Sequence, residues 1–579
     1  MPRASSLAAA TALASLTAAA PVLAADPIMP LSQVRKGMKC TARSVVQGTD
    51  ISTFDVEVLD VVAGDEAKRQ PLILVRVSGP AVDETGVAEG FSGSPIYCPD
   101  DAGVQRVIGA IAFASGDYGG HVALATPIES VLGLPVDPPK GTKKNSKAAR
   151  HKKPLAAPIA VGGLSEPVAR AFRRASARAH RRLTTAPFAP VTSSFPPQQL
   201  VPGASMAVGL ASGDITAGAV GTVTYTDGDK VWGFGHPFDA TGRRQLLLQD
   251  AYVYTVIGNP VGVGDAVSQK LAAPGHLLGT ISADGPDGVA GRVGQLPPQI
   301  PIRVDARDAD TDTRQVVTTL VPDETAVGDP SGGSPLSLAG PMAVAQAAFS
   351  VLESSPARLS GSMCVRITVK ERPKPIRFCN AYVDAGGGPE NDDSDSAVPG
   401  GALVADMTNA LTDLDAFKLG ELHVISVGAR LTLERGLNQA YILRARAPRT
   451  VRRGQRVPIR LSLRRVFGGR ISRTIRVRIP RATATGVRDL ILIGTPADGA
   501  SADAALDLGN GTPDDEAGPR STSALSRQIA GIHRYDGIRL TFGDPGEHEG
   551  TGTGTGTKAY RDPDLRISGR ARVRTFVTG

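Results

Sequence analysis

The stretch that most constrains the fold of this chain is residues 90–97, Gly-Phe-Ser-Gly-Ser-Pro-Ile-Tyr. Gly90 and Gly93 allow backbone conformations that a side chain would block, and Pro95 fixes φ where the following strand begins. This spacing predicts a tight turn that exposes Ser92 at its tip. The Ser92 hydroxyl would then lie beside the backbone N–H groups of Gly90 and Ser92. An acyl-transfer nucleophile needs this arrangement, because the two amides can stabilise the developing oxyanion.

The composition favours many short strands and turns over long helices. The 579 residues include 66 glycines and 44 prolines, and only 4% are aromatic. At about 100–200 residues per domain, this length indicates three or four domains. The formal net charge of +8 is concentrated locally, and no aromatic residues interleave with the basic ones to stack bases. We therefore expect no nucleic-acid partner.

The first 24 residues have the pattern of a secretory signal peptide. A basic start at Arg3 is followed by an apolar, alanine-rich core over residues 7–23, and residues 22–24 offer a small-x-small cleavage site. We see no later run of about 18 apolar residues, so no transmembrane anchor is expected after signal removal. The mature protein is expected to be secreted or associated with the cell envelope.

Four cysteines fit an oxidising compartment. Cys364 and Cys379 flank a predicted hairpin, and a local bridge between them would leave Cys40 to pair with Cys98. Four cysteines allow three pairings, and the sequence does not choose among them. No CxxC motif or His/Cys cluster indicates a metal site, and we expect no cofactor.

After the signal peptide the chain divides into five segments by changes of pattern. These are a serine-bearing β-barrel half (25–137), a basic linker with a short helix (138–200), a histidine-bearing β-barrel half (201–385), an acidic linker (386–400), and a β-sandwich-like domain with a low-complexity C-terminal segment (401–579).

The two linkers are read as solvated chain. Lysines and arginine crowd residues 140–153, and a helix is predicted to begin at Ser165-Glu166-Pro167. The alternative for this basic linker is docking to an anionic polymer of the cell envelope. The aspartates of 386–400 lack the glycine and terminal glutamate of a calcium loop.

A neutral serine needs a base, and histidine suits that role near neutral pH. Of eight histidines, His121, His236 and His276 lie outside the basic linker and the C-terminal region. His236 lies in a predicted tight turn at the end of a strand and is the preferred base. His121 is the second choice, although its place suits a wall of the substrate cleft. Ser94 is expected to support the turn through a backbone hydrogen bond.

These two motifs together resemble the SpoIVB peptidase (S55) family, over roughly residues 30–135 and 205–300. The family's second half is matched by residues 32–61, 90–96, 108–110 and 118–121, and its first half by 221–224, 233–236 and the glycine-rich stretch that follows. The resemblance implies a serine endopeptidase with a trypsin-like double β-barrel. It also implies that Ser92 is the nucleophile and His236 the base.

The chain departs from the family pattern in three ways. The serine-bearing half precedes the histidine-bearing half, as in a circular permutation; catalytic triads are defined by geometry rather than by chain order. The family's aspartate falls near Gly79, where Asp83 is the nearest replacement and Asp239 another candidate. We see neither a PDZ module nor a membrane anchor, so the substrate of sporulation members is not carried over.

Residues 328–335, Gly-Asp-Pro-Ser-Gly-Gly-Ser-Pro, resemble a trypsin-type serine turn with an inserted proline. The proline changes the backbone before the serine, and no second histidine motif accompanies the stretch. We interpret it as a surface loop.

The expected protein is mostly β, with a permuted trypsin-like double β-barrel followed by a β-sandwich-like domain. The expected function is that of a secreted serine endopeptidase acting through Ser92, His236 and Asp83, with Gly90 and Ser92 as oxyanion donors. Its substrate would be a protein or peptide, or its own linker near residues 140–153. The alternative is a catalytically retired, exported binding or scaffold protein of the cell envelope.

Overall fold

The structure is a computed structural model with several gaps in the part of the chain that it describes. It describes residues 25–63, 71–114, 119–138, 158–178, 183–185, 195–258, 268–327, 334–354, 356, 358–384, 400–417, 422–494, 519–532, 537–543, 557–560, 562 and 564–579. The predicted signal peptide, the basic run 140–153, nearly all of the acidic linker and most of the Gly-Thr repeat at 550–557 lie outside these residues.

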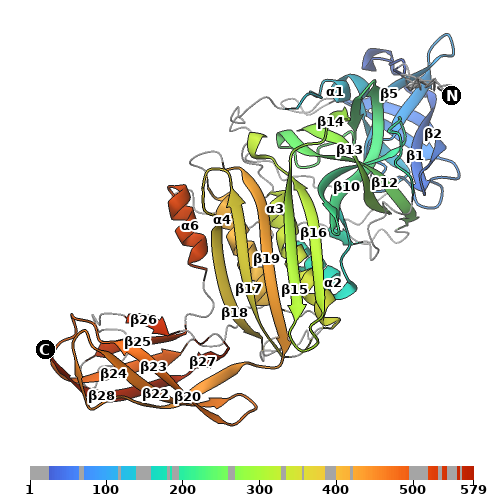
Figure 1. Cartoon of the computed structure of the whole chain (residues 1–579). Coiled ribbons are helices and arrows are strands. Elements are labelled where there is room, and N and C mark those ends of the chain that lie inside the picture. Colours follow the sequence, from blue (N-terminus) through green and yellow to red (C-terminus); the bar gives the residue numbers. More distant parts are fainter. Residues whose placement is uncertain are drawn as a thin grey trace, which may run out of the picture.

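The molecule is elongated and mostly β, as the composition predicts (Figure 1). Two β-barrel units lie together at one end, and a sheet with helices forms the middle. A second all-β module, which includes the C-terminus, lies at the other end.

The first unit is a closed barrel with the strand order β1-β2-β3-β6-β5-β4. Alternating residues build its core; in β2, for example, Phe54, Val56 and Val58 are buried while their neighbours are more exposed. Its strands are β1 (Lys39–Gln47), β2 (Asp50–Val62), β3 (Leu72–Ser78), β4 (Pro95–Pro99), β5 (Gln105–Ala114) and β6 (Val122–Pro127). A short helix, α1 (Ile128–Leu132), follows.

The second unit repeats this topology. Pairings β9–β10, β10–β11, β11–β14, β14–β13, β13–β12 and β12–β9 join six strands into a ring. Numbered in chain order, both rings read 1-2-3-6-5-4. The strands are β9 (Ser205–Gly213), β10 (Thr216–Asp227), β11 (Lys230–Gly233), β12 (Gly242–Ile257), β13 (Gln269–Gly285) and β14 (Gly288–Val293).

The predicted serine and histidine turns occupy the same position in the two rings. Ser92 lies between β3 and β4, and His236 lies between β11 and β12. Each is therefore in the connection between the third and fourth strands of its ring. Residues far apart in the sequence are thus presented by equivalent loops.

Segments on both sides of the basic run join the second unit. β7 (Ile159–Gly162) pairs with β10, and β8 (Leu183–Thr185) pairs with β7. The predicted helix is confirmed as α2 (Glu166–Arg178), with Glu166 forming ion pairs with Arg170 and Arg173.

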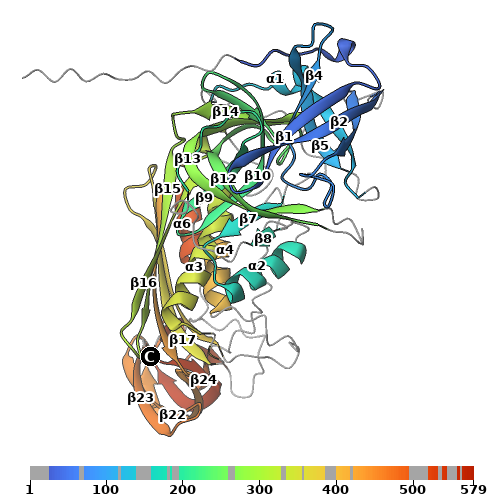
Figure 2. The same cartoon turned by 90° about the vertical axis from the view of Figure 1, so that its right-hand side faces the viewer.

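The middle of the molecule is a sheet with helices on one face (Figure 2). Its strand order is β18-β17-β19-β15-β16, and β16 continues into the second ring through β9. The strands are β15 (Gln299–Asp308), β16 (Arg314–Pro322), β17 (Leu359–Val369), β18 (Ile376–Asp384) and β19 (Val424–Arg435). The main helices are α3 (Pro335–Leu352), α4 (Gly401–Asp415) and α6 (Thr522–Ala530). The ring of the histidine-bearing unit therefore ends at β14, well before the expected boundary at 385.

Within the described residues, α3 is the one helix long and apolar enough to cross a membrane. It is largely buried, and it packs against β15, β16 and α4. Core helices of this kind share the length and composition of membrane spans.

The C-terminal module packs two sheets around an apolar core. One has the order β23-β22-β20-β27 and the other β21-β28-β24-β25-β26. The strands are β20 (Gln439–Arg446), β21 (Thr450–Arg452), β22 (Arg456–Arg465), β23 (Arg470–Arg478), β24 (Gly486–Gly494), β25 (Ile538–Gly543), β26 (Thr557–Tyr560), β27 (Arg566–Ser568) and β28 (Arg570–Thr578). The alternation of apolar and basic residues in the sequence is thus confirmed as a two-sheet arrangement.

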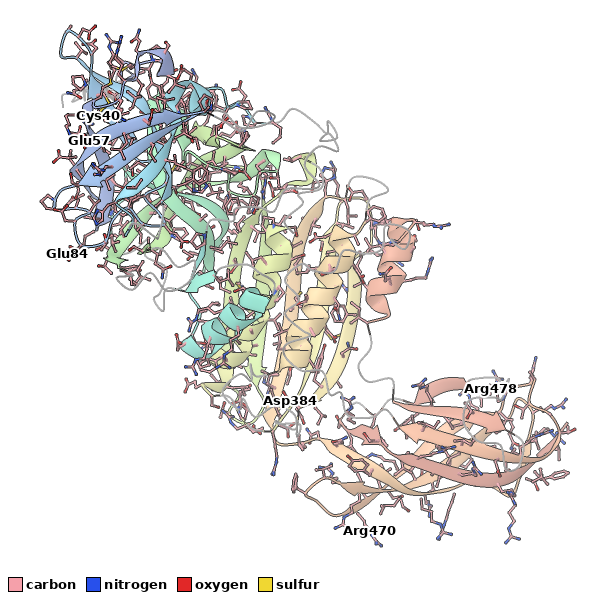
Figure 3. All side chains as sticks on the ribbon, turned by 180° about the vertical axis from the view of Figure 1, so that it is seen from behind. Cys40, Glu57, Glu84, Asp384, Arg470 and Arg478 are labelled. Carbon is pink, nitrogen blue, oxygen red and sulfur yellow. A yellow bond between two sulfur atoms is a disulfide. The ribbon has the colours of Figure 1, made fainter. Side chains whose placement is uncertain are left out.

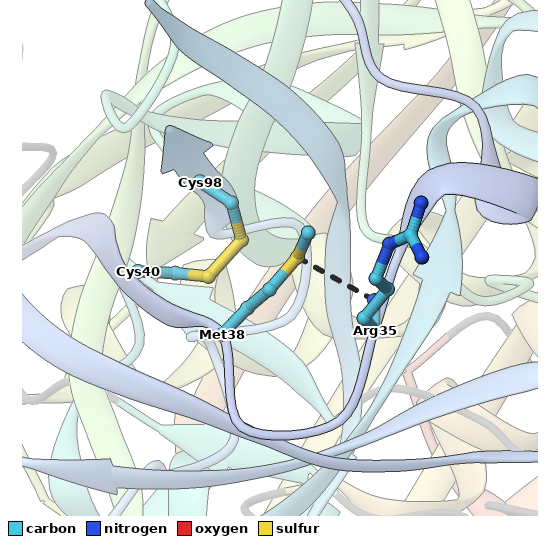
Figure 4. The surroundings of a disulfide bond; sticks show 4 residues. All are labelled: Arg35, Met38, Cys40 and Cys98. Carbon is cyan, nitrogen blue, oxygen red and sulfur yellow. Dashed lines mark hydrogen bonds between the residues drawn. A yellow bond between two sulfur atoms is a disulfide. The ribbon is translucent and has the colours of Figure 1, made fainter. Parts of the chain in front are cut away.

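Two disulfide bonds are present. Cys364 and Cys379 lie directly opposite each other on β17 and β18. Cys40 and Cys98 join β1 to β4 in the first ring, and Met38 lies beside that bond (Figure 4). Of the three pairing schemes that four cysteines allow, the structure has the one in which Cys364 and Cys379 form the local bridge and Cys40 pairs with Cys98. Two disulfide bonds agree with an oxidising compartment.

Candidate active site

The turn around Ser92 is built as the sequence predicts. Gly90 and Gly93 have φ of 97° and 95°, values that favour glycine. The carbonyl of Phe91 accepts a hydrogen bond of 2.6 Å from Ser94 Oγ and one of 2.9 Å from Ser94 N. The expected supporting role of Ser94 is thus confirmed, while Ser92 lies half-buried at the tip of the turn.

Fixed carbonyls orient the two amides that were expected to bind an oxyanion. In a trans peptide, C=O and N–H point in opposite directions. The Glu89 carbonyl is held by Lys270 N at 2.9 Å, and the Phe91 carbonyl is held by Ser94. The N–H groups of Gly90 and Ser92 therefore point away from these partners. In the described part of the chain neither amide has a hydrogen-bond acceptor, so both can donate to a ligand.

The turn around His236 is held from the first ring. Phe234 and Gly235 both have positive φ, and the Gly235 carbonyl accepts a 2.6 Å hydrogen bond from Thr126 Oγ1 of β6. His236 Nδ1 lies 2.8 Å from the Pro237 carbonyl oxygen. A carbonyl can only accept, so the proton is on Nδ1 and Nε2 is left as the basic nitrogen.

Burial favours the neutral form of the His236 ring. The ring packs against Phe113 of β5 and Phe234, with ring centroids 5.7 and 6.0 Å apart. Desolvation lowers the pKa of His236 below its ordinary value, and the hydrogen bond to the Pro237 carbonyl opposes only part of that shift. A neutral imidazole with a free Nε2 is the form that can accept a proton.

The two turns meet where the rings pack together. Thr222 N of β10 donates to the Ser92 carbonyl at 2.8 Å. A Cβ added to Gly93 would lie 2.0 Å from the Thr222 carbonyl oxygen and 2.5 Å from Phe234 N, so only glycine allows this approach. The Ile111 carbonyl accepts from Gly93 N, and Gly235 packs against the same carbonyl. Ser92 and His236 thus each lie next to a glycine that touches Ile111.

No hydrogen bond joins Ser92 to His236 among the described residues, and no carboxylate orients the His236 ring. Asp83, expected to be the third member, instead accepts from Gly79 N at 2.7 Å and stabilises its own exposed turn. The backbone carbonyl of Pro237 occupies the position on Nδ1 that the carboxylate of a catalytic triad takes. Asp83 thus has a local partner, and no contact between Asp83 and His236 occurs among the described residues.

The alternative candidates make other contacts. Asp239 binds Arg244 at 3.2 Å. His121 precedes β6, where its carbonyl accepts from Val77 N. Residues 328–333 of the trypsin-like stretch lie outside the described residues; Ser334, which follows them, caps α3 by accepting from Ser337 N.

A buried ion cluster that the sequence did not indicate supports the histidine turn. Asp284, fully buried on β13, accepts from the backbone N–H groups of Phe238 and Asp239 at 2.7 Å each. Arg244, also buried, is bidentate to Glu324 at 2.8 and 2.9 Å. Burial raises the pKa of Asp284 to about 6, although Arg244 opposes the shift. In the sequence, this cluster is indicated only by charged residues within otherwise apolar strands, namely Arg244 in β12 and Asp284 in β13.

A second unpredicted group lies behind the serine turn. The buried Nζ of Lys270 is 2.8 Å from Ser44 Oγ and 4.4 Å from the centre of the Phe91 ring. Ser44 Oγ is 3.2 Å from Thr222 Oγ1, which donates to the Gly90 carbonyl at 3.0 Å. Since that carbonyl can only accept, a consistent chain of donors runs from Lys270 through Ser44 and Thr222 to Gly90. It links both rings to the loop that carries the expected oxyanion donors.

Lys270 should make the stability of the protein depend on pH. Burial lowers the pKa of Lys270 to about 7, whereas an unfolded lysine titrates at about 10.4. Between these values the unfolded chain binds one more proton, so the free energy of unfolding rises by about 1.4 kcal/mol per pH unit from this group. Below about pH 7 both states are protonated and the contribution is constant.

Lys270→Met is therefore expected to remove this slope in denaturant unfolding measured between about pH 7 and 9. Lys230→Met is the matched control, since Lys230 is partly exposed and ion-paired with Asp227 at 2.7 Å; it should keep the native slope. Equal slopes for the native protein and Lys270→Met would contradict a neutral buried lysine.

Comparison of the chain with protein-family models, curated proteins and solved structures gives no match.

Proposed function

We propose that this protein is a serine endopeptidase in which Ser92 attacks the peptide carbonyl and His236 takes its proton. The observation that carries the proposal is the meeting of the two turns across the rings, with Nδ1 of His236 bound to the Pro237 carbonyl. Two rings of one topology, each contributing its loop between third and fourth strands, support the permuted trypsin-like arrangement that the resemblance implies.

The proposed mechanism uses groups of this chain alone. Ser92 Oγ forms the bond to the carbonyl carbon while Nε2 of His236 accepts its proton. The N–H groups of Gly90 and Ser92 stabilise the oxyanion, and His236 then gives the proton to the leaving amine. Water then attacks the carbonyl carbon of the acyl-enzyme while His236 accepts its proton. His236 returns the proton to Ser92 Oγ, and the acid product leaves. The Pro237 carbonyl holds the imidazole tautomer in place of a carboxylate.

Export of the protein belongs to the same proposal. It is supported by the signal-like pattern of residues 1–24 and by the two disulfide bonds. The substrate class proposed is protein or peptide, which leaves the chain's own linker among the candidates.

Labelling with a fluorophosphonate tests the proposal, because such a probe reacts with serines that a base activates. The native protein should be labelled, and Ser92→Ala and His236→Ala should not. His121→Ala is the matched control and should still be labelled. Loss of labelling in His121→Ala, with His236→Ala unaffected, would transfer the role of base to His121.

The second candidate is a non-catalytic exported binding protein. The specific observation in its favour is that His236 has no carboxylate partner and makes no hydrogen bond to Ser92 in the described structure. Absence of labelling in the folded native protein would support this candidate over the peptidase.

The labelling rate should fall at acid pH, but at a lower pH than for an ordinary histidine. His236 must be neutral to accept the proton of Ser92, so protonated His236 cannot act as the base. Since burial lowers the pKa of His236, we expect half the maximal rate to be reached below about pH 6.5. The measurement is the labelling rate constant between about pH 5 and 8. A midpoint above pH 7 would mean that another group controls reactivity.

A further inference from the structure

The C-terminal module has a strongly basic sheet face. Between Glu434 and Asp489 the sequence has sixteen arginines, no lysine and no carboxylate. Eight of these arginines are exposed on the outer face of β20, β22 and β23, and we call this set the arginine face. Its members are Arg444, Arg446, Arg456, Arg460, Arg464, Arg470, Arg476 and Arg478.

Strand register places arginines of this face directly opposite one another. Three such pairs occur across neighbouring strands: Arg446 with Arg460, Arg464 with Arg470, and Arg456 with Arg478. Like charges at opposite positions destabilise a sheet. Repulsion between the arginines of this face therefore lowers the stability of the sheet, and binding of an anionic partner would reduce that repulsion.

The eight guanidinium groups have no ion pair with a carboxylate in the described part of the chain. The contrast with nearby arginines is clear: the inward-facing Arg473 pairs with Asp562 at 3.0 Å, and Arg574 of the other sheet pairs with Asp489 at 3.1 Å. Figure 3 labels Arg470 and Arg478, which mark the two ends of β23 on this module. The face is open to a ligand from outside the chain.

We propose that the arginine face binds a linear polymer that carries phosphate groups. Arginine, unlike lysine, presents a planar fork that pairs with phosphate through two hydrogen bonds, and every charged residue of β20, β22 and β23 is an arginine. Alternate residues of a strand are about 6.7 Å apart and neighbouring strands about 4.8 Å apart. The positive charges therefore repeat along and across the strands, which suits a repeating anion.

A polymer without bases fits better than nucleic acid. Single-stranded nucleic acid is bound through aromatic platforms as well as charge. Tyr441, opposite Arg464, is the one aromatic residue on the three described strands of this face. For an exported protein, a phosphate-bearing polymer of the cell envelope has the required chemistry.

The test is titration of the full mature chain with long-chain linear polyphosphate at several salt concentrations. The variant R456Q/R460Q/R464Q removes the charges of β22 alone. At about 0.15 M salt it should bind about tenfold more weakly. For this variant, the slope of log K against the logarithm of salt concentration should be smaller than the native slope by about one for each removed arginine that contacts the polymer.

The matched control is R303Q/R307Q/R314Q, which removes the same charge from β15 and β16. Arg303 pairs with Asp305, and Arg307 and Arg314 pair with Asp312. This control should keep native affinity within about twofold. The melting temperature should rise on addition of polyphosphate for the native chain and for the control, but less for the β22 variant. The melting temperature of the unliganded β22 variant should equal or exceed the native value, which checks that it is folded.

Three results would overturn the proposal. Equal weakening by both triple variants would show that net charge alone is responsible. Tighter binding of single-stranded DNA with the same number of phosphates would make the partner a nucleic acid. Binding that appears only after the chain's own Asp514, Asp515 and Glu516 are neutralised would make that acidic segment the occupant.

Discussion

Ser92→Ala is expected to hydrolyse a denatured protein substrate roughly 10⁶-fold more slowly than the native chain, with an unchanged melting temperature. Ser92 Oγ makes no hydrogen bond in the described structure and is only half-buried. Its removal should therefore cost little packing energy. The turn itself is held by Ser94 and Phe91, which the substitution leaves intact.

The double variant Ser92→Ala/His236→Ala sharpens this prediction. Groups that act as one catalytic unit show non-additive losses, so the double variant should be no slower than Ser92→Ala alone. Ser362→Ala, which changes an exposed serine of β17, is the control and should retain native activity. Additive losses, or hydrolysis that persists in Ser92→Ala, would contradict the proposed pair.

Arg244→Met is expected to lower the free energy of unfolding by about 3–5 kcal/mol. Arg244 is 1% exposed and compensates the charge of Glu324, Asp239 and Asp284. Burial lowers the pKa of Arg244, whereas the three carboxylates raise it. The effect of the carboxylates is larger, so the pKa of Arg244 is raised overall. Without the guanidinium, buried negative charges are left without their partner.

Denaturant unfolding checks this prediction, with Arg292→Met as the control. Arg292 also has two carboxylate partners, Asp137 at 2.7 Å and Asp229 at 2.8 Å, but it lies at the surface. Its loss should have a far smaller effect, because exposed ion pairs contribute little. Arg244→Met should also abolish fluorophosphonate labelling at denaturant concentrations that the native protein tolerates, since the cluster holds the backbone after His236. Similar losses of stability in the two variants would mean that burial is not decisive.

Local features of this chain could be predicted from sequence because neighbouring residues determine them. The two glycines and Pro95 specify the Ser92 turn, and Ser94 bonds within that turn. The start of α2 follows from Ser165-Glu166-Pro167. In these cases a residue's partners lie within a few positions.

Long-range partners could not be predicted in the same way. Lys270 reaches Ser44 across 226 positions, and Arg244 reaches Glu324 across 80. Asp83 was expected to orient the histidine because it lies nearest to the position where the resemblance places an aspartate, yet the N–H of Gly79, four residues away, donates to its carboxylate. The second ring ends at β14 because β14 pairs with β11 as well as with β13, and because β12 returns to β9. Such contacts depend on register across the whole ring, which periodicity does not specify.

The order of the two rings along the chain has a consequence for biosynthesis. The ring that carries Ser92 is complete by Pro127, whereas His236 emerges more than a hundred residues later. Thr222 and Phe234, which meet the serine turn, also belong to the later ring. With the proposed roles, a nascent or partly translocated chain has a nucleophile but neither its base nor the surface that positions it. The proposed hydrolytic activity would then begin only after the second ring has emerged and docked, so the polypeptide is protected from its own chemistry while it is being made and exported.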